Sequence, residues 1–346
     1  MGMKKEGGAY KPVQKYLAEV MHTMPELHND RMPLWTIEEY DPLLDSADMN
    51  PDDWVKIAND INQYYYDYDG FVVIHGTDTM GYTASALSFI FENLGKPVVL
   101  TGACTPIVEV VSDGRRNLIV SMLIAAYCDV PEVCVFFNDK LMRGNRTSKV
   151  DAWGLEAFSS GYFPPLGTLG LQLKLDVKVT LPQPKGRFRV TRKFSRNCAV
   201  LRILPGLSEE VVKNILRPPL QGLVLQLYGV GTMPQRSEKL FEIMVEAINR
   251  GVVIVCVTQC HSGTIDLGLY QAGSSLSRLG IVSGYDMTCE AAYTKLAYLL
   301  GGYYSVERVK QLMSTDLRGE LTKNNPHLYG EGGMWQTHPI TSRSSL

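Results

Sequence analysis

The sequence predicts an α/β protein with two doubly wound parallel-sheet domains, in which helices cover both faces of each sheet. Apolar runs such as residues 70–74 and 132–138 show no alternation with polar residues, which is typical of strands buried on both faces. Helical patterns of about 15 residues separate these runs, as they do in parallel sheets. The length of 346 residues favours two domains rather than one.

Composition argues against several kinds of partner. The formal net charge is −2 and no long basic run is present, so we expect no nucleic-acid partner and no membrane surface. No stretch reaches the roughly 18 to 20 apolar residues of a transmembrane helix, and the first residues lack the apolar core of a signal peptide. We therefore expect a cytoplasmic protein.

The cysteines and glycines give no sign of a metal or cofactor. The seven cysteines are odd in number and several lie in apolar runs, which fits buried thiols better than disulfides. Cys256 and the pair Cys260-His261 follow one predicted strand, where four residues span about 13 Å, too far for one zinc ion. No dinucleotide-binding or phosphate-loop motif is present. We expect neither a metal nor a cofactor.

In the first half of the chain, local signals predict the elements in order. Residues 7–12 are predicted to be a mobile loop, because glycines and a proline dominate them. Asn50 and Pro51 supply a cap and a first-turn proline for the first clear helix. The next elements are strand 71–76, a helix that ends at 95–97, strand 97–102, a helix that begins at 113–117 and strand 132–138.

Proline and basic residues concentrate in residues 181–197, which predicts a linker. The linker divides an N-terminal catalytic domain, residues 1–180, from a smaller C-terminal domain, residues 198–322. Residues 323–346 are predicted to be a polar tail. The second domain is predicted to contain strands 199–204, 222–227 and 251–259 and helices near 208–216, 240–248, 289–300 and 305–314.

The turn His75-Gly76-Thr77-Asp78-Thr79 is the strongest candidate for a functional site. It joins a predicted strand to a helix, and ligands of open α/β sheets bind at the carboxyl ends of the strands. Free N–H groups at the start of the helix point toward such a ligand. Two interpretations are open: the side chains of the turn perform chemistry, or they only cap the helix.

Segment 140–149 is unusually basic for the exit from a buried strand. Its charges either lie in solvent, or one amine returns to the cleft beside Thr77. A threonine hydroxyl needs a base to remove its proton, and a desolvated lysine can be that base with an aspartate beside it. Helix-start N–H groups can stabilise the carbonyl oxygen. Such a set suits the hydrolysis of a small polar amide.

Several motifs together resemble the L-asparaginases, in particular the intracellular type I enzymes and the asparaginase domain of animal lysophospholipase-type proteins. The resemblance extends from about residue 2 to about residue 322, and the H-G-T-D-T turn is its most specific motif. The other matching motifs are Asp45-Ser46, Ser112-Asp113-Gly114 with Asn117, 143–149, 228–231, 258–260 and 318–322.

The resemblance implies an asparaginase-like fold and the hydrolysis of L-asparagine to L-aspartate and ammonia without a cofactor. Thr77, Asp78 and Lys149 match the family's second catalytic group. Asp45 and Ser46 match the positions that hold the α-amino and α-carboxylate groups of the substrate.

The resemblance also bears on Tyr10 and on assembly. Tyr10 matches the tyrosine of a flexible loop that closes over the substrate, and the alternative is a tyrosine in a disordered end. Family members imply a homodimer or homotetramer with sites near the subunit interface. Cys104 departs from the family pattern, which commonly has glutamine at this position.

One larger departure concerns the first catalytic group. The family carries a T-G-G-T-I-G motif at the end of its first strand, and its second threonine is usually the nucleophile; this sequence contains no such motif. We therefore expect the N-terminal sheet to lack its first strand. Three explanations are open: the sequence is incomplete at its start, the protein is an inactive relative that still binds asparagine or aspartate, or Thr77 is the nucleophile with Lys149 as its base.

Overall fold

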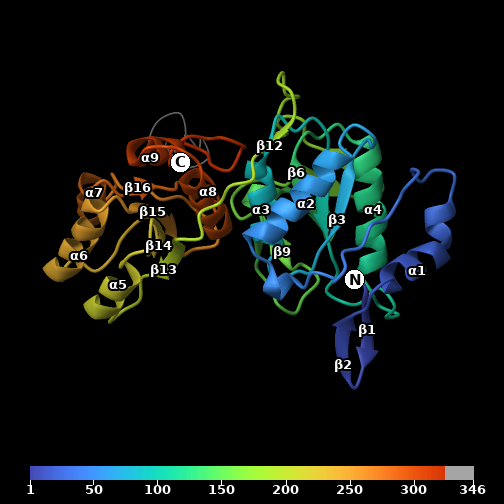
Figure 1. The fold of residues 1–346 in the computed structure, drawn as a ribbon, viewed down its shortest axis with the longest axis horizontal. Helices are drawn as coiled ribbons and strands as arrows, with labels where there is room; N and C mark the ends of the chain where they lie inside the picture. The colour runs from blue at the N-terminus through green and yellow to red at the C-terminus, as the bar shows by residue number, and fades with distance from the viewer. Residues whose placement is uncertain (324–346) are drawn as a thin grey trace, which may run out of the picture.

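The structure, a computed structural model, describes residues 1–323. Figure 1 shows two α/β units side by side, a first unit with a sheet in residues 71–175 and a second unit with a sheet in residues 198–283. The tail predicted for residues 323–346 lies outside the described residues apart from Lys323. None of the helices within residues 1–323 combines the length and apolar character needed to cross a bilayer.

The sheet of the first unit has six strands, and its central strands are buried as the apolar runs predict. Strands β3, β5 and β6 are parallel, and β7, β10 and β11 continue the sheet in antiparallel pairing. Across the sheet the order is β11 (Leu173–Leu175), β10 (Gly167–Leu169), β7 (Lys140–Arg143), β6 (Val133–Phe137), β5 (Val98–Thr101) and β3 (Phe71–Ile74).

The prediction of an α/β fold is confirmed, but the prediction that the first sheet is parallel throughout is wrong. Asn138 and Asp139, with φ of 45° and 62°, form a two-residue turn between β6 and β7. Two consecutive residues with positive φ make a tight hairpin, so the next strand must return antiparallel. The basic segment therefore continues as β7, the short helix η3 (Gly144–Arg146) and β8 (Ser148–Lys149), which pairs with β9 (Phe158–Ser159).

Helices cover both faces of this sheet, because alternate strand residues point to opposite sides. On one face Val98 and Leu100 pack with α2 (Pro51–Gln63) and α3 (Met80–Ile90). On the other face Val99 packs with α4 (Gly114–Tyr127). Helix α1 (Tyr16–Thr23), η1 (Pro25–His28) and α4 form a further apolar cluster beside β3. Within residues 1–323 no second strand pairs with β3, which is an edge strand.

The first residues form an element that the sequence did not predict. Instead of a loop, β1 (Met3–Glu6) and β2 (Ala9–Pro12) make an antiparallel hairpin that projects from the first unit (Figure 1). Gly7 and Gly8, with φ of 60° and 90°, make its turn. Two adjacent glycines take these angles at no steric cost, so the feature that indicated a loop instead specifies a hairpin turn.

The second unit is a parallel sheet, as predicted, and it has four strands where the sequence predicted three. Its order is β13 (Cys198–Arg202), β14 (Gly222–Leu227), β15 (Val253–Thr258) and β16 (Val282–Ser283). One face packs with α5 (Glu209–Ile215), α6 (Glu238–Asn249) and α7 (Gln271–Arg278), and the other with α8 (Cys289–Gly301) and α9 (Val306–Met313). The sequence analysis missed α7 and β16, which are short and have few apolar residues.

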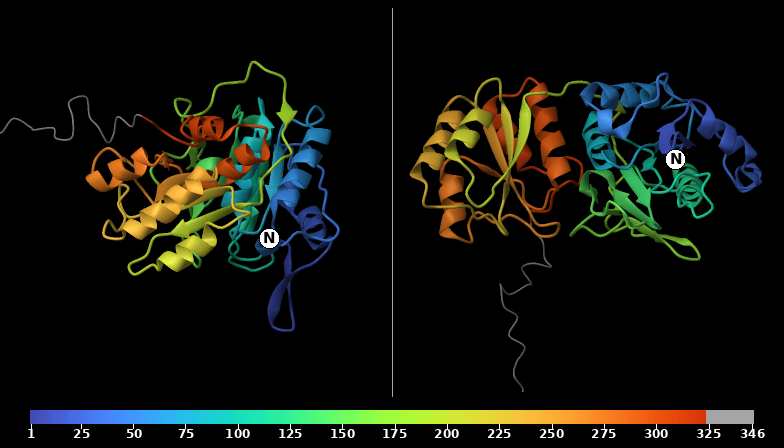
Figure 2. Two further views of the ribbon diagram at one scale, coloured as in Figure 1. Left: turned by 60° about the vertical axis from the view of Figure 1, so that its left-hand side comes forward. Right: turned by 90° about the horizontal axis from the view of Figure 1, so that it is seen from below.

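The two units contact each other directly. Helix α3 of the first unit lies against α8 of the second, where Ser85 and Thr294 hydroxyls are 2.7 Å apart and Phe89 stacks on Tyr298. The predicted linker passes between the units on one side (Figure 2) and is not free. Its strand β12 (Arg189–Val190) pairs with β4 (Phe91–Glu92), which fixes the path of the chain between the two sheets.

Candidate functional site

The turn after β3 is held rigidly by a buried histidine. The Nδ1 atom of His75 lies 2.6 Å from the Gly76 carbonyl oxygen, and its Nε2 atom lies 3.0 Å from Thr83 Oγ1. Since a carbonyl oxygen only accepts, Nδ1 carries the hydrogen and Nε2 accepts from the threonine. Burial lowers the pKa of His75, which keeps the ring neutral.

Lys149 reaches this turn from the far end of the basic segment. Its Nζ atom donates to Thr77 Oγ1 at 2.9 Å and to Asp78 Oδ1 at 2.7 Å. The lysine side chain is 24% exposed and the aspartate 65%, so the group lies partly open to solvent. Of the two interpretations of the basic segment, the structure shows the one in which an amine returns beside Thr77.

The arginines of the same segment do not lie in solvent either. Arg143 is buried in an ion pair with Glu132, and Arg146 in an ion pair with Asp286 of the second unit at 2.9 Å. The interpretation of residues 140–149 as solvated loop charges is therefore wrong for these side chains. A buried carboxylate neutralises each guanidinium.

The capping interpretation of the turn is wrong for the residue that occupies the capping position. Thr79 is the N-cap of α3, yet its hydroxyl makes no cap hydrogen bond. It donates instead to the carbonyl oxygen of Ser46 at 2.6 Å. The Thr79 side chain thus makes a contact across the site rather than capping the start of the helix.

Asp45 and Ser46 lie next to this turn in the short helix η2 (Ser46–Asp48). A Cβ atom on Gly76 would lie 2.3 Å from Ser46 Oγ, so only glycine permits this close approach. The Asp45 carboxylate accepts from the Ala47 N–H at 3.0 Å. The structure therefore brings the predicted substrate-binding pair and the group of Thr77, Asp78 and Lys149 to one place.

The loop after β5 forms another wall of the site. The backbone N–H groups of Cys104 and Thr105 donate to the Asp113 carboxylate at 3.0 and 3.1 Å. Burial raises the pKa of the Cys104 thiol, and the Lys149 charge acts on it in the opposite direction. Cys104 thus lies near the amine of Lys149, at the position where the family commonly has glutamine.

Tyr10 is the one predicted site residue that the structure does not bring to this group. It lies on β2, 40% exposed, and its hydroxyl donates to Glu109 Oε1 at 2.6 Å. This hydrogen bond raises the pKa of Tyr10. The residue belongs to an ordered hairpin, so the alternative of a disordered end is wrong, while its role in catalysis stays a proposal.

One contact beside Lys149 could not be predicted from the sequence. The hydroxyl of Ser148 donates to Glu290 Oε2 in the second unit at 2.9 Å, and burial raises the pKa of Glu290. No motif links positions 148 and 290, since only the packing of α8 brings them together. Hydrogen bonding by His75 was missed as well, although its place in the turn was a usable signal.

Within residues 1–323 no group of three or more His, Cys, Asp or Glu side chains is arranged to hold a metal ion. The chemical groups of the site are a hydroxyl, an amine and carboxylates at the carboxyl end of a parallel strand. Such a set is typical of an enzyme that acts on an acyl group.

The chain belongs to the asparaginase family. Residues 1–181 match the family described as "Asparaginase, N-terminal", and residues 197–313 match the "Glutaminase/Asparaginase C-terminal domain". The resemblance inferred from the motifs is thereby confirmed.

Curated relatives and solved structures agree with this assignment. The chain is 46% identical to L-asparaginase 1 of Escherichia coli, over 94% of this chain and 96% of that one. It is 41% identical to the 60 kDa lysophospholipase of Mus musculus, over 93% of this chain and 61% of that one. A crystal structure of L-asparaginase I from Vibrio cholerae matches with a TM-score of 0.87 and 46% identity, over 93% and 95% of the two chains.

Proposed function

We propose that this protein hydrolyses L-asparagine to L-aspartate and ammonia by threonine-based acyl transfer, without a cofactor. One observation carries the proposal: the Lys149 amine lies 2.9 Å from Thr77 Oγ1 and 2.7 Å from Asp78 Oδ1. The names of the relatives, L-asparaginases, support asparagine as the substrate.

The proposed substrate position follows from the charges of the site. The carboxylate of Asp45 binds the α-amino group of asparagine and the hydroxyl of Ser46 binds its α-carboxylate. The side-chain amide then faces Thr77 and Lys149. Asp78 holds the lysine so that its nitrogen stays on the threonine hydroxyl.

The proposed reaction has two balanced steps. In its neutral form Lys149 takes the proton of Thr77, whose oxygen attacks the amide carbon; the carbon–nitrogen bond breaks and ammonia leaves with that proton. The product is an acyl ester on Thr77. Lys149 then takes a proton from water, the hydroxide attacks the ester carbon, and the threonine oxygen leaves with the proton while aspartate is released.

A second role for Thr77 follows from the family's missing motif. If a T-G-G-T-I-G strand supplies the nucleophile, Thr77, Asp78 and Lys149 instead activate the attacking group. Comparing the ammonia release of the chain as printed with that of a version carrying this strand at its start distinguishes the two roles. Activity in the printed chain assigns the nucleophile to Thr77, and activity only in the longer version assigns it to the added threonine.

The test is ammonia release from L-asparagine by matched variants. We expect Thr77→Val and Lys149→Met to lower kcat by about 100-fold or more, since each removes a group that moves a proton. Thr168→Val and Lys140→Met are the controls, because both side chains lie in the same sheet and take no part in the proposed site. Wild-type rates in the first pair would show that the proposed roles are wrong.

The alternative function is binding of asparagine or aspartate without hydrolysis. The absence of a T-G-G-T-I-G motif from the sequence is the observation that favours it. It predicts that either ligand raises the melting temperature while no ammonia appears. If millimolar concentrations of both ligands leave melting unchanged, the assignment of the cleft itself is wrong.

The proposal includes a cytoplasmic homodimer or homotetramer that has no nucleic-acid or membrane partner. Support for assembly comes from large exposed apolar side chains on two loops beside the site. These are Val110 and Val111 on one loop and Trp153 and Leu155 on the other. The loops meet where the Cys104 thiol donates to the Gly154 carbonyl at 3.5 Å.

A further inference from the structure

The segment that carries Lys149 makes an ion pair and several hydrogen bonds with the second unit. Arg146 pairs with Asp286 at 2.9 Å, donates to the Gly319 carbonyl at 2.7 Å and donates to Thr322 Oγ1 at 2.9 Å. Asn145 donates to the carbonyl oxygen of Arg318 at 2.9 Å. The position of the amine in the first unit therefore depends on contacts with the other unit.

The contact nearest to Lys149 is the hydrogen bond from Ser148 to Glu290 at 2.9 Å. Ser148 and Lys149 are the two residues of β8, and within residues 1–323 this strand pairs with the equally short β9 alone. Two residues of ladder give little support to a strand by themselves. The direction of Lys149 thus requires a further attachment, and Ser148 provides it.

Strand geometry explains why a bond at Ser148 fixes Lys149. Successive side chains of a strand point to opposite sides, so Ser148 faces Glu290 while Lys149 faces Thr77. Rotation of β8 about its axis would move both side chains at once. A hydrogen bond on one side therefore restrains the amine on the other.

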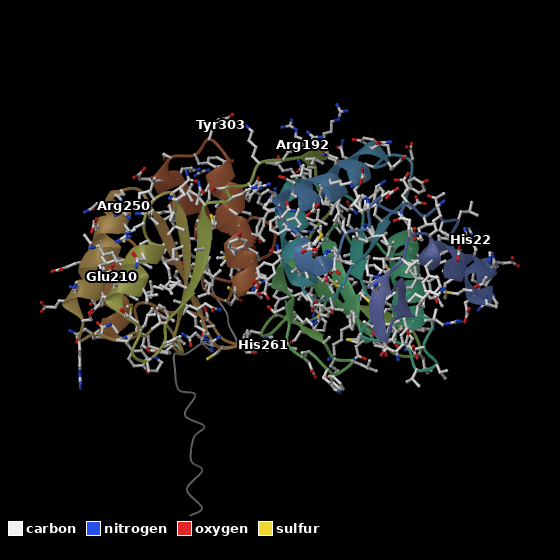
Figure 3. The ribbon with its side chains drawn as sticks, turned by 60° about the horizontal axis from the view of Figure 1, so that its bottom comes forward. His22, Arg192, Glu210, Arg250, His261 and Tyr303 are labelled. Carbon is white, nitrogen blue, oxygen red and sulfur yellow. The ribbon has the colours of Figure 1, made fainter. Side chains whose placement is uncertain are left out.

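The surroundings of Glu290 make this attachment rigid. Glu290 lies in the first turn of α8, close to the start of α3: a Cβ atom on Gly81 would lie 2.8 Å from the Thr147 carbonyl and 3.7 Å from Glu290 Cγ. Figure 3 shows His261 where the two units face each other. Burial raises the pKa of the Glu290 carboxyl group. The carboxylate is thus enclosed by both units.

We propose that Glu290 is a positioning residue that holds Ser148, so that the second unit sets the distance between Lys149 and Thr77. The effect on catalysis rests on the function proposed above, but the effect on the lysine does not. The requirement is a hydrogen-bond acceptor at position 290, which glutamine also supplies and alanine lacks.

Steady-state kinetics of ammonia release give the first readout. We expect Glu290→Ala and Ser148→Ala each to lower kcat about tenfold with KM changed less than about twofold, because a small misplacement of a reacting group slows chemistry more than binding. The double variant should be no worse than either single one, since both break the same contact. Glu290→Gln should keep most of the activity.

Labelling of Lys149 by an amine-reactive reagent, followed by mass spectrometry, gives the second readout. The amine should be labelled several-fold faster in Glu290→Ala and Ser148→Ala and at the parent rate in Glu290→Gln. Ser305→Ala is the control for general destabilisation, because it removes the cap of α9 without touching this contact. That variant should have a lower melting temperature, yet its Lys149 should be labelled at the parent rate.

The outcomes distinguish the two proposals. If the parent protein releases no ammonia, the proposed function fails while the labelling rates still test the attachment. Equal labelling of Lys149 in the parent, Glu290→Ala and Ser148→Ala would overturn the positioning role. So would a Glu290→Gln variant as impaired as Glu290→Ala, since the contact would then depend on charge rather than on an acceptor.

Discussion

At the scale of single residues, the site depends on which groups carry protons. His75 is neutral because its two ring nitrogens have opposite roles, one donating to Gly76 and the other accepting from Thr83. Protonation would place a second hydrogen between Nε2 and the threonine oxygen and would charge a buried ring. The order of the turn after β3 is therefore tied to the neutral form of one side chain.

This predicts a pH dependence with a defined sign. Because burial lowers the pKa of His75 in the folded state, the unfolded chain binds the proton more readily, and the free energy of unfolding falls as the pH drops below about 6.5. The contribution reaches up to about 1.4 kcal/mol per pH unit between the unfolded and folded pKa values. Urea unfolding at pH 7.5 and 5.5 measures it.

Replacement of His75 should remove this contribution to the pH dependence of the free energy of unfolding. His75→Leu should cost about 1–3 kcal/mol at pH 7.5, because the Gly76 carbonyl and the Thr83 hydroxyl lose a buried partner. The stability gap to the parent should then narrow at pH 5.5. His22→Asn is the control, since His22 lies on the surface (Figure 3). The difference in the free energy of unfolding between this variant and the parent should be the same at both pH values. A constant gap for His75→Leu would contradict the neutral assignment.

At the scale of elements, buried and exposed ion pairs should differ in their effect on folding. Arg146→Ala leaves the buried Asp286 without its ion-pair partner. Removal of one member of a buried ion pair lowers the free energy of unfolding by about 3–5 kcal/mol. Arg116→Ala breaks the exposed pair with Asp139 and should cost about 1 kcal/mol or less. Urea unfolding of the two variants compares them. Similar losses would show that η3 does not depend on the second unit.

The hairpin at the start of the chain gives a second prediction at this scale. A double change of Gly7 and Gly8 to alanine places Cβ atoms in open space, so its cost of about 1–2 kcal/mol per residue comes from the positive φ angles alone. Amide exchange in residues 3–12 should accelerate while the melting temperature stays nearly constant, because β2 is exposed. Gly170→Ala is the control. A Cβ atom at this position would also lie in open space, but Gly170 does not have a positive φ angle.

The same double change tests the role proposed for Tyr10, which lies on β2. If the tyrosine closes over the substrate, a loosened hairpin should raise KM for asparagine. A change in amide exchange with unchanged kinetics would separate the hairpin from catalysis.

At the scale of the whole molecule, the exposed apolar loops beside the site predict self-association. Light scattering should give a mass of two or four times 38.5 kDa. Val110→Ser combined with Trp153→Ser should shift the protein toward smaller species, because both side chains are almost fully exposed in a single chain. Val177→Ser, on another exposed surface, is the control. A monomeric parent protein would contradict the assembly proposed here.

Much of the architecture could be predicted from local patterns. Continuous apolar runs identified the buried strands, and the parallel sheet of the second unit followed from their spacing with helices. Two of the failures share one cause, which is turn chemistry: Gly7-Gly8 and Asn138-Asp139 each form a tight hairpin, and neither was recognised as one. Because of the second turn, β7 runs opposite to β6, and two of the six strands of the first sheet, β7 and β11, run against the others.

The sequence by itself determined the family. It also placed a hydroxyl and a carboxylate in one strand–helix turn, because residues a few positions apart stay close whatever surrounds them. The residue pattern left open which amine of the basic segment faces Thr77, and the family resemblance pointed to Lys149. The tertiary structure brings that amine to Thr77 across 72 positions. It also decided that Ser148 meets Glu290 across 142 positions. Such pairs depend on how two units pack, and packing energy is distributed over many contacts that no local pattern records.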